Sequence, residues 1–162
     1  MSIMIRTATM DDLEAIAQAE KESFPPSEAA DRKEFEERLQ QYAGHFWLMF
    51  NEERLIAFVD GFVTDEPDLT DEMYEKADMH NENGAWQMLF GVVTVPDQRN
   101  RGYAGQLIRA AIADAKKQGR KGIVLTCKEH LTGYYELFGF RNEGISKSVH
   151  GDAVWYQMRL RF

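Results

Sequence analysis

Several features are scarce in this 162-residue chain, and each absence excludes a class of protein. The single cysteine, Cys127, cannot form an internal disulfide, which favours a reducing compartment such as the cytoplasm. No apolar run approaches the roughly 20 residues that cross a bilayer. The N-terminus MSIMIRTATMDD lacks the basic and apolar regions of a signal peptide. We therefore expect a cytoplasmic protein with no membrane association.

Positive charge is also scarce, with 19 Lys and Arg against 27 Asp and Glu and a net charge of −8. General nucleic-acid binding requires a basic surface that displaces counterions, so we expect no nucleic-acid partner. An acidic surface attracts cationic small molecules, although the same charge also simply confers solubility.

Signatures of metal and nucleotide sites are missing as well. The chain has no HExxH, no CxxC and no carboxylate set at metal-ligand spacing, so we expect no metal. It also lacks GxGxxG and GxxxxGK[ST], which argues against a dinucleotide fold and a P-loop.

The order of elements predicts one α/β or α+β domain over residues 1–162. Residues 3–7 alternate as a strand, and Thr9 with Asp12 resembles a capping box before a helix that PPS ends. A second helix over residues 28–42, a hairpin over 45–63 and an acidic segment with one or two helical turns follow. Next come a strand over 85–95, a helix ending at Gly119 and a strand over 122–127, which predict a parallel crossover. A short helix and a closing hairpin around residues 150–152 complete about seven strands and four helices.

The turn QRNRGYAG, residues 98–105, joins the strand over 85–95 to the following helix. Amides at the start of a helix have no partner within it, and the helix dipole adds positive charge there, so anions bind at such ends. Gly102 and Ala104 leave room beside those amides, and Arg99 and Arg101 can add charged contacts. These features indicate a diphosphate site, although a glycine-rich turn can also be only a tight connection.

The motif VVTVPDQRNRGYAGQLI resembles the acetyl-CoA motif of the GNAT superfamily of N-acetyltransferases, in which Arg or Gln is followed by two residues, Gly, one residue, and Gly or Ala. Arg99, Gly102 and Ala104 match this pattern, and Tyr135 before Gly139 and Phe140 matches a second motif. Within the superfamily, RLIAFVDGFVTDEPDLT, VLTCKEHLTGYYELFGF and SFPPSE resemble arylalkylamine N-acetyltransferases, the serotonin-acetylating type.

The resemblance implies a twisted mixed sheet that is splayed between its fourth and fifth strands, with acetyl-CoA as co-substrate. Backbone groups of Val92, Val93 and Thr94 would bind the pantetheine arm. The diphosphate would lie on the turn, whose cofactor-binding residues are Arg99, Asn100, Arg101, Gly102, Tyr103, Ala104 and Gly105.

Acetyl transfer to an amine requires a neutral nucleophile, a polarised carbonyl and a proton for the leaving thiolate. By resemblance Tyr135 is the general acid, although it could also only pack and hydrogen-bond the cofactor sulfur. We expect the neighbouring Tyr134 to face the core, and a backbone amide near Val92 to polarise the carbonyl.

The residues at the general-base positions differ from the family pattern. Vertebrate arylalkylamine enzymes carry a His pair where this chain has Met88 and Phe90. Asp60 is the leading substitute, since a carboxylate between Phe58 and Phe62 is expensive to bury without a purpose. It could equally be a strand-edge Asp that is wet on one side. His80 and His45 are weaker candidates.

The acceptor is expected between the lid SFPPSEAADRKEF and the acidic segment after the third strand. Phe24, Pro25 and Pro26 would form an apolar wall, and Met88, Phe90 and Asp60 would line the acceptor site. The implied acceptor is a small amine that is aromatic, otherwise apolar, or polycationic, although both segments could be ordinary solvated loops. Two alternatives remain open: a non-catalytic acetyl-CoA sensor, and an acetyltransferase of protein amino groups. We expect a monomer or homodimer.

Overall fold

The computed structural model describes residues 2–162, which divide into two compact units. Unit 1 contains residues 2–61 and 91–111, and unit 2 contains residues 62–90 and 112–162. Each unit is thus built from two separate stretches of chain. The expectation of a single domain stays a prediction.

Unit 1 contains a four-stranded antiparallel sheet in the order β1-β2-β3-β6. These strands span Ile3–Thr7, Phe46–Asn51, Arg54–Asp60 and Gly91–Thr94. Five of the six residues of β2 are buried, which explains why its sequence is almost continuously apolar rather than alternating. The predicted hairpin of β2 and β3 is confirmed.

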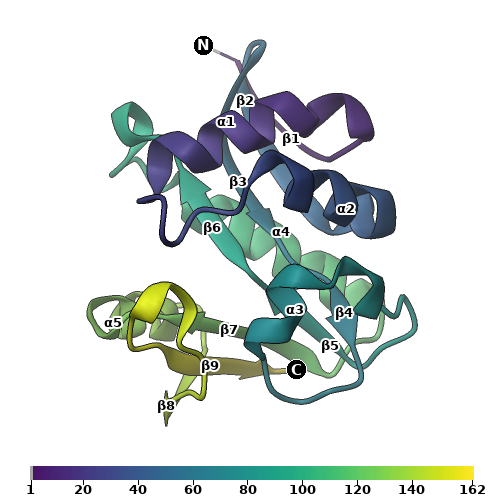
Figure 1. The fold of residues 1–162 in the computed structure, drawn as a ribbon, viewed down its shortest axis with the longest axis vertical. Helices are drawn as coiled ribbons and strands as arrows, with labels where there is room; N and C mark the ends of the chain where they lie inside the picture. The colour runs from purple at the N-terminus through teal and green to yellow at the C-terminus, as the bar shows by residue number, and fades with distance from the viewer. Residues whose placement is uncertain (1) are drawn as a thin grey trace. The chain divides into compact units, whose positions relative to one another are not determined.

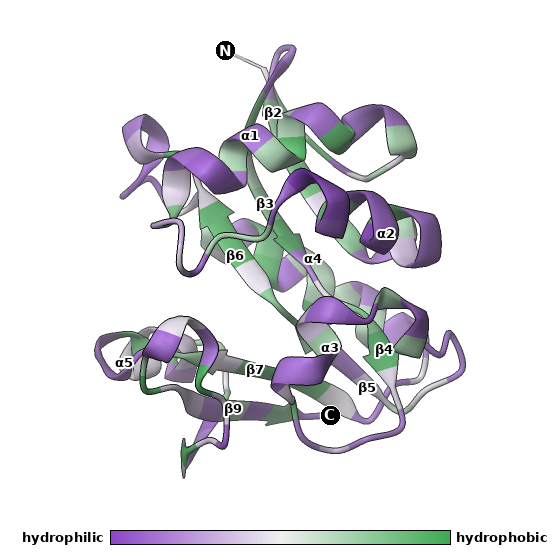
Figure 2. Ribbon diagram, in the orientation of Figure 1, coloured by the Kyte–Doolittle hydropathy of each residue, from purple (hydrophilic) through white to green (hydrophobic). Residues whose placement is uncertain are grey.

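The helices α1 (Leu13–Ser23) and α2 (Arg32–Tyr42) cover this sheet, with α1 packed on β3 and β6 (Figure 1). The capping box of Thr9 and Asp12 is present as expected. Helix α2 begins four residues later than predicted, because Asp31 and Glu34 form a capping box that fixes its start. Figure 2 shows β3 and β6 largely hydrophobic and α2 largely hydrophilic, as expected of a core strand pair and its outer cover.

Unit 2 contains a five-stranded mixed sheet in the order β4-β5-β7-β9-β8. These strands span Val63–Thr64, Trp86–Leu89, Gly122–Cys127, Tyr156–Arg161 and Arg141–Ile145. Strands β5 and β7 are parallel, and α4 (Tyr103–Lys117) lies between them in sequence, so the predicted crossover is confirmed. The short helices are α3 (Asp71–Glu75) and α5 (Thr132–Glu136).

Residues 2–162 form nine strands rather than about seven, because two predicted long strands each divide. The first divides between Asp60 and Val63 into β3 and β4, and the second divides at Phe90 into β5 and β6. In each case the two halves hydrogen-bond to different sheets. Within residues 2–162, β7 pairs with β5 and has no pairing with β6, in agreement with the expected splay.

The predicted closing hairpin around residues 150–152 is confirmed, because β8 and β9 pair antiparallel and a short 3₁₀ turn over His150–Asp152 lies between them. The first strand ends earlier than predicted, so a ten-residue loop over 146–155 separates β8 from β9. Asp71 accepts hydrogen bonds from Ser148 and from the Val149 amide, so the loop is held by α3 rather than by strand pairing. We call residues 146–155 the β8–β9 loop.

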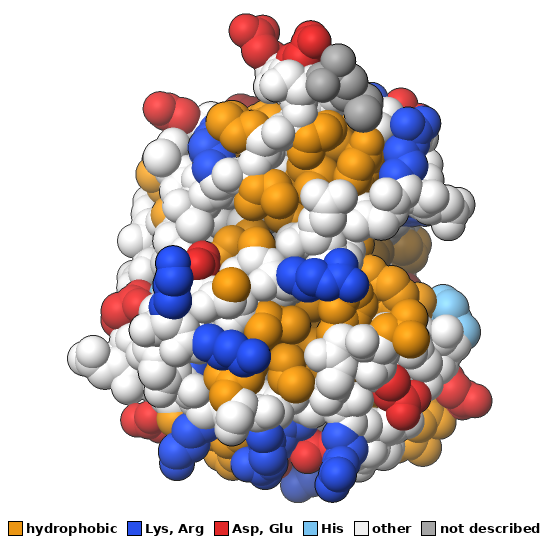
Figure 3. All heavy atoms as spheres, turned by 180° about the vertical axis from the view of Figure 1, so that it is seen from behind, with side chains coloured by type: hydrophobic (Ala, Val, Ile, Leu, Met, Phe, Trp, Pro, Cys, Tyr) orange, Lys and Arg blue, Asp and Glu red, His pale blue; other side chains and the backbone are white. Residues whose placement is uncertain are grey.

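Within residues 2–162, no helix has both the length and the apolar character that crossing a bilayer requires. The acidic excess does not form one continuous surface on the face in Figure 3, where Lys and Arg side chains gather at the lower end and apolar side chains separate the charges. Net charge alone therefore gives no argument for attraction of a cation to that face.

Candidate active site

Strand β6 is the edge strand of the sheet in unit 1, because it pairs with β3 and with no other strand of that sheet. Its residues Val92, Val93 and Thr94 face Val59, Phe58 and Ala57 of β3. In an antiparallel pair, alternate residues direct their N–H and C=O groups away from the partner. Part of the β6 backbone thus offers hydrogen-bonding groups that the sheet of unit 1 does not use.

The turn after β6 contains a row of amides that the fold itself does not use. Helix α4 makes its first hydrogen bond from the Gln106 N–H to the Gly102 carbonyl, at 3.2 Å. Within residues 2–162, none of the backbone N–H groups of residues 100–105 has a hydrogen-bond acceptor. Asn100 and Gly102 have φ angles of 65° and 79°, which curve the chain so that successive amides can form an anion-binding nest.

The side chains of this turn have different partners from those that we expected. Arg99 donates from Nε to the Thr94 carbonyl at 3.0 Å and from Nη2 to the Ser23 carbonyl at 3.3 Å. It therefore ties the turn to β6 and to the end of α1. Arg101 is exposed. A Cβ at Gly102 would meet no heavy atom within 4 Å, so the protein itself requires glycine there for its positive φ and not for space.

Tyr135, on α5 in unit 2, is only 6% exposed. Burial raises the pKa of its phenol above the ordinary value, and Cys127, Tyr134 and Tyr74 add to the increase. The proton thus stays on the phenol well into the alkaline range, as a proton donor requires. Tyr134 is half-buried and less buried than Tyr135, and its ring packs edge-on against Tyr135 at 5.2 Å and against Phe138 at 5.3 Å.

Cys127 is buried at the end of β7, and burial raises the pKa of its thiol to about 11. A thiol is a weak nucleophile compared with the thiolate. Cys127 is therefore suited to packing beside Tyr135 rather than to covalent catalysis.

A family model described as the acetyltransferase (GNAT) family matches residues 11–140. The match includes both the turn after β6 and Tyr135, and it covers well over half of the chain. The chain belongs to the acetyltransferase (GNAT) family. It is accordingly an N-acetyltransferase, and family membership leaves the acceptor open.

Solved structures of GNAT proteins share this fold. The loading GNATL domain of CurA from Lyngbya majuscula has a TM-score of 0.86 at 13% identity, covering 99% of this chain and 98% of that one. The ribosomal-protein-S18-alanine N-acetyltransferase from Escherichia coli has a TM-score of 0.74 at 17% identity, with 99% and 94% covered. The PaiA N-acetyltransferase from Thermoplasma acidophilum, in complex with coenzyme A, has a TM-score of 0.71 at 16% identity, with both chains fully covered. Among curated protein sequences, none matches this chain.

Asp60 lies at the end of β3 with 1% of its surface exposed, so it is not a wet strand-edge residue. Its Oδ2 accepts a hydrogen bond from Arg38 Nη1 at 3.1 Å, and Arg38 is itself 4% exposed. Oδ1 has no hydrogen-bond partner within residues 2–162, and it would lie 2.8 Å from a Cβ at position 91. Gly91 therefore gives this carboxylate its space, and Arg38 gives it a counter-ion that the sequence analysis did not identify.

Glu20 is a second buried carboxylate near this pair, with 6% of its surface exposed. Its Oε2 accepts from the Ala30 amide at 3.0 Å, which holds the segment between α1 and α2. Burial raises the pKa of Glu20 to about 7, and the charge of Asp60 adds to this, while the Ala30 amide and Arg38 oppose it. In the same segment, Phe24 is half-buried and Pro25 is exposed.

The raised pKa of Glu20 predicts a pH-dependent stability. The folded protein holds this proton more tightly than the unfolded chain does, so the stabilisation is full below about pH 4.5 and is lost as the pH rises through about 7. The shift in the pKa of Glu20 corresponds to about 3 kcal/mol in the free energy of unfolding. We expect Glu20→Gln to remove this component when urea unfolding is measured between pH 4.5 and 8. Glu22→Gln, at an exposed position of the same helix, is the control, and equal pH slopes for Glu20→Gln and the wild type would contradict the assignment.

Met88 and Phe90, which we expected to line the acceptor site, differ in exposure. Met88 on β5 is fully buried, so it lies in the core of unit 2 rather than on an accessible acceptor surface. Phe90 is half-buried and packs edge-on against Phe62 at 5.0 Å between ring centroids and against Tyr74 at 4.9 Å.

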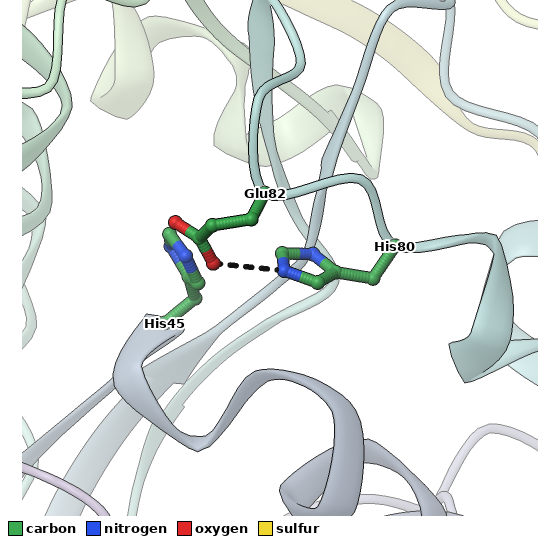
Figure 4. Close-up of side chains that lie close together, drawn as sticks. All are labelled: His45, His80 and Glu82. Carbon is green, nitrogen blue, oxygen red and sulfur yellow. Dashed lines mark hydrogen bonds and ion pairs between the residues drawn. The ribbon is translucent and has the colours of Figure 1, made fainter.

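His80 has partners that explain its position without catalysis. Its Nδ1 accepts from the Val63 amide at 3.1 Å, and its Nε2 lies 3.0 Å from Glu82 Oε1 (Figure 4). Arg120 also holds Glu82, with 3.1 Å between Nη2 and Oε2. Since Nδ1 is an acceptor, the neutral ring carries its proton on Nε2 and donates it to Glu82.

Sequence reasoning missed four residues in these surroundings: Arg38, Glu20, Tyr74 and His150. Arg38 could have been found, because Phe35, Arg38, Leu39 and Tyr42 follow helical spacing and are all buried. Tyr74 and His150 had no such signal, because they are 76 positions apart in sequence and their rings stack only in the folded unit 2.

Proposed function

We propose that this chain transfers the acetyl group of acetyl-CoA to the primary amine of a small acceptor by direct attack. The observation that carries the proposal is the row of amides at residues 100–105 without acceptors at the start of α4. Such a row, with the helix dipole behind it, matches the chemistry of a diphosphate.

In this proposal the backbone of Val92, Val93 and Thr94 on the edge strand β6 binds the pantetheine arm. Residues 99–105 bind the diphosphate mainly through amides, and Arg101 adds a charged contact. Arg99 acts as a positioning residue, because its hydrogen bonds to Thr94 and Ser23 hold the turn in place. The coenzyme A complex of the T. acidophilum neighbour supports the cofactor.

The acceptor class is proposed from residues of this chain together with the resemblance to arylalkylamine N-acetyltransferases. Phe90 in unit 2 is half-buried among aromatic rings. This ring suits an amine with an apolar or aromatic body. The E. coli neighbour is named as an acetyltransferase of a ribosomal protein, so a protein amino group is the alternative acceptor.

Gly102→Val tests the diphosphate assignment. A β-branched residue is strained at φ 79° by more than about 1 kcal/mol, so the turn should relax and its amides should no longer converge. We expect the Kd for coenzyme A to rise at least about tenfold in calorimetric titration. Gly44→Val is the control, since that glycine has open space and no positive φ. Unchanged affinity in Gly102→Val would remove the turn as the diphosphate site.

Catalysis is tested by incubating acetyl-CoA with panels of small amines and of peptides while the release of free thiol is followed. Faster thiol release with small amines than with peptides is the expected result. Tight coenzyme A binding without thiol release from any acceptor would instead support a non-catalytic sensor.

A further inference from the structure

Tyr74 on α3 is the centre of a row of rings in unit 2 that come from three separate parts of the chain. Phe90 lies 4.9 Å away on one side, and His150 stacks on Tyr74 at 4.9 Å with an interplanar angle of 8°. Trp155 lies 6.0 Å beyond His150. Tyr74, Phe90, His150 and Trp155 are all half-buried, and we call them the aromatic row.

Neighbouring side chains hold the backbone at His150. Trp155 Nε1 donates to the His150 carbonyl at 2.8 Å, and Asp71 accepts from the preceding amide, that of Val149, at 2.9 Å. The Tyr74 hydroxyl lies 3.3 Å from Thr126 Oγ1 on β7, which fixes the ring on which the imidazole stacks. An imidazole is a common general base in enzymes, and this one stacks on a tyrosine ring that is itself hydrogen-bonded to β7.

One member of the aromatic row, Tyr74, lies in the electrostatic surroundings of the proposed acid. Tyr74 and Cys127 both act on the titration of Tyr135, and Thr126, the partner of Tyr74, directly precedes Cys127 in β7. In unit 2, Tyr74 therefore acts electrostatically on the proton donor Tyr135 and also stacks on the imidazole of His150.

We propose that His150 accepts the proton of the attacking amine and that the rings of Tyr74, Phe90 and Trp155 bind the acceptor's aromatic body. This inference rests on the proposed function. The amine nitrogen forms a bond to the acetyl carbon as the carbon–sulfur bond breaks. The nitrogen proton passes to His150, and the Tyr135 proton passes to the departing sulfur. Water then carries a proton from His150 to Tyr135, so the products are an amide and a free thiol.

This assignment replaces Asp60 with His150 as the proton acceptor. Asp60 has Arg38 as its partner and is almost fully buried, whereas His150 is half-exposed in a loop. The titratable or charged groups on the elements packed against His150 include Tyr74 and Asp71 from α3, Asp152 in its own turn, and Lys128, which lies 5.7 Å over the Trp155 ring.

The test measures kcat/KM from pH 5.5 to 9.5 with acetyl-CoA and two probe amines, 2-phenylethylamine and n-propylamine. We expect His150→Gln to lower kcat about 100-fold without changing the KM for acetyl-CoA and to remove the fall in rate on the acidic side. Added imidazole should raise the rate of His150→Ala about tenfold or more, which a purely structural histidine would not allow. Tyr74→Leu should raise the KM for 2-phenylethylamine about tenfold and leave that for n-propylamine nearly unchanged.

His130→Gln, at an exposed histidine of unit 2, is the control and should match the wild type. If the wild type is active and His150→Gln keeps the same rate and pH profile, the role of His150 is overturned and the proposed function stands. Absence of thiol release from the wild type with every amine would overturn the proposed function and this inference together.

Discussion

Tyr135→Phe is expected to lower kcat by about 100-fold to 10,000-fold, because general acid catalysis contributes rate factors of that size. Phenylalanine keeps the ring contact with Phe140 at 6.0 Å and loses only the hydroxyl. Within residues 2–162 no hydrogen bond to that hydroxyl is present, so its removal leaves no protein group unpaired. Steady-state kinetics should therefore show a lower kcat with little change in the KM for acetyl-CoA or in the midpoint of thermal unfolding.

The pH profile gives an independent measurement of the same role. Because burial raises the pKa of Tyr135, the wild type should not lose activity from deprotonation of this phenol up to about pH 10. Tyr134→Phe is the matched control, since it removes a hydroxyl from the neighbouring and more exposed ring. A Tyr135→Phe enzyme as fast as Tyr134→Phe would show that Tyr135 only packs beside the cofactor.

Features fixed by neighbours in sequence were predicted well. The capping box at Thr9 and Asp12, the crossover helix and the turn at residues 98–105 each depend on local rules for helix ends, apolar periodicity and glycine. The family motifs predicted the cofactor and the candidate acid Tyr135, because each motif is a fixed spacing of residues within a short segment. These are the features that a single sequence determines without knowledge of the sheet order.

Features that depend on long-range pairing could not be predicted in the same way. The apolar run over 85–95 suits either sheet equally, so its division at Phe90 follows only from the hydrogen bonding of β5 to β7 and of β6 to β3. The turn at residues 150–152 lies where expected, but the loop around it is longer than the sequence indicated, because Asp71, almost 80 residues earlier, holds residues 148 and 149. The candidate base changed with it, since the stack of His150 on Tyr74 exists only in that loop conformation.

Arg38→Met is expected to destabilise the protein by about 3 to 5 kcal/mol, because it leaves the buried carboxylate of Asp60 without its cation. Methionine has a similar length and suits the apolar surroundings, where the guanidinium now lies 5.1 Å from the Phe35 ring centroid. Glu20, whose pKa the Arg38 charge holds down, should become still easier to protonate. Urea unfolding at neutral pH should show this decrease in the free energy of unfolding. The decrease should become smaller at lower pH, because the carboxylates take up protons.

The double variant Arg38→Met with Asp60→Val distinguishes the contribution of the ion pair to stability from the contribution of side-chain packing. Removal of both charges leaves no buried ion without a partner, and replacement of a buried pair by apolar residues is often neutral or stabilising, so most of the lost stability should return. Arg32→Met is the control on the same helix, because its ion pair with Glu14 is exposed and its loss should leave the unfolding midpoint nearly unchanged. If Arg38→Met were as stable as Arg32→Met, the buried ion pair of Arg38 and Asp60 would not stabilise the fold, and Asp60 would be neutral or hydrated without its cation.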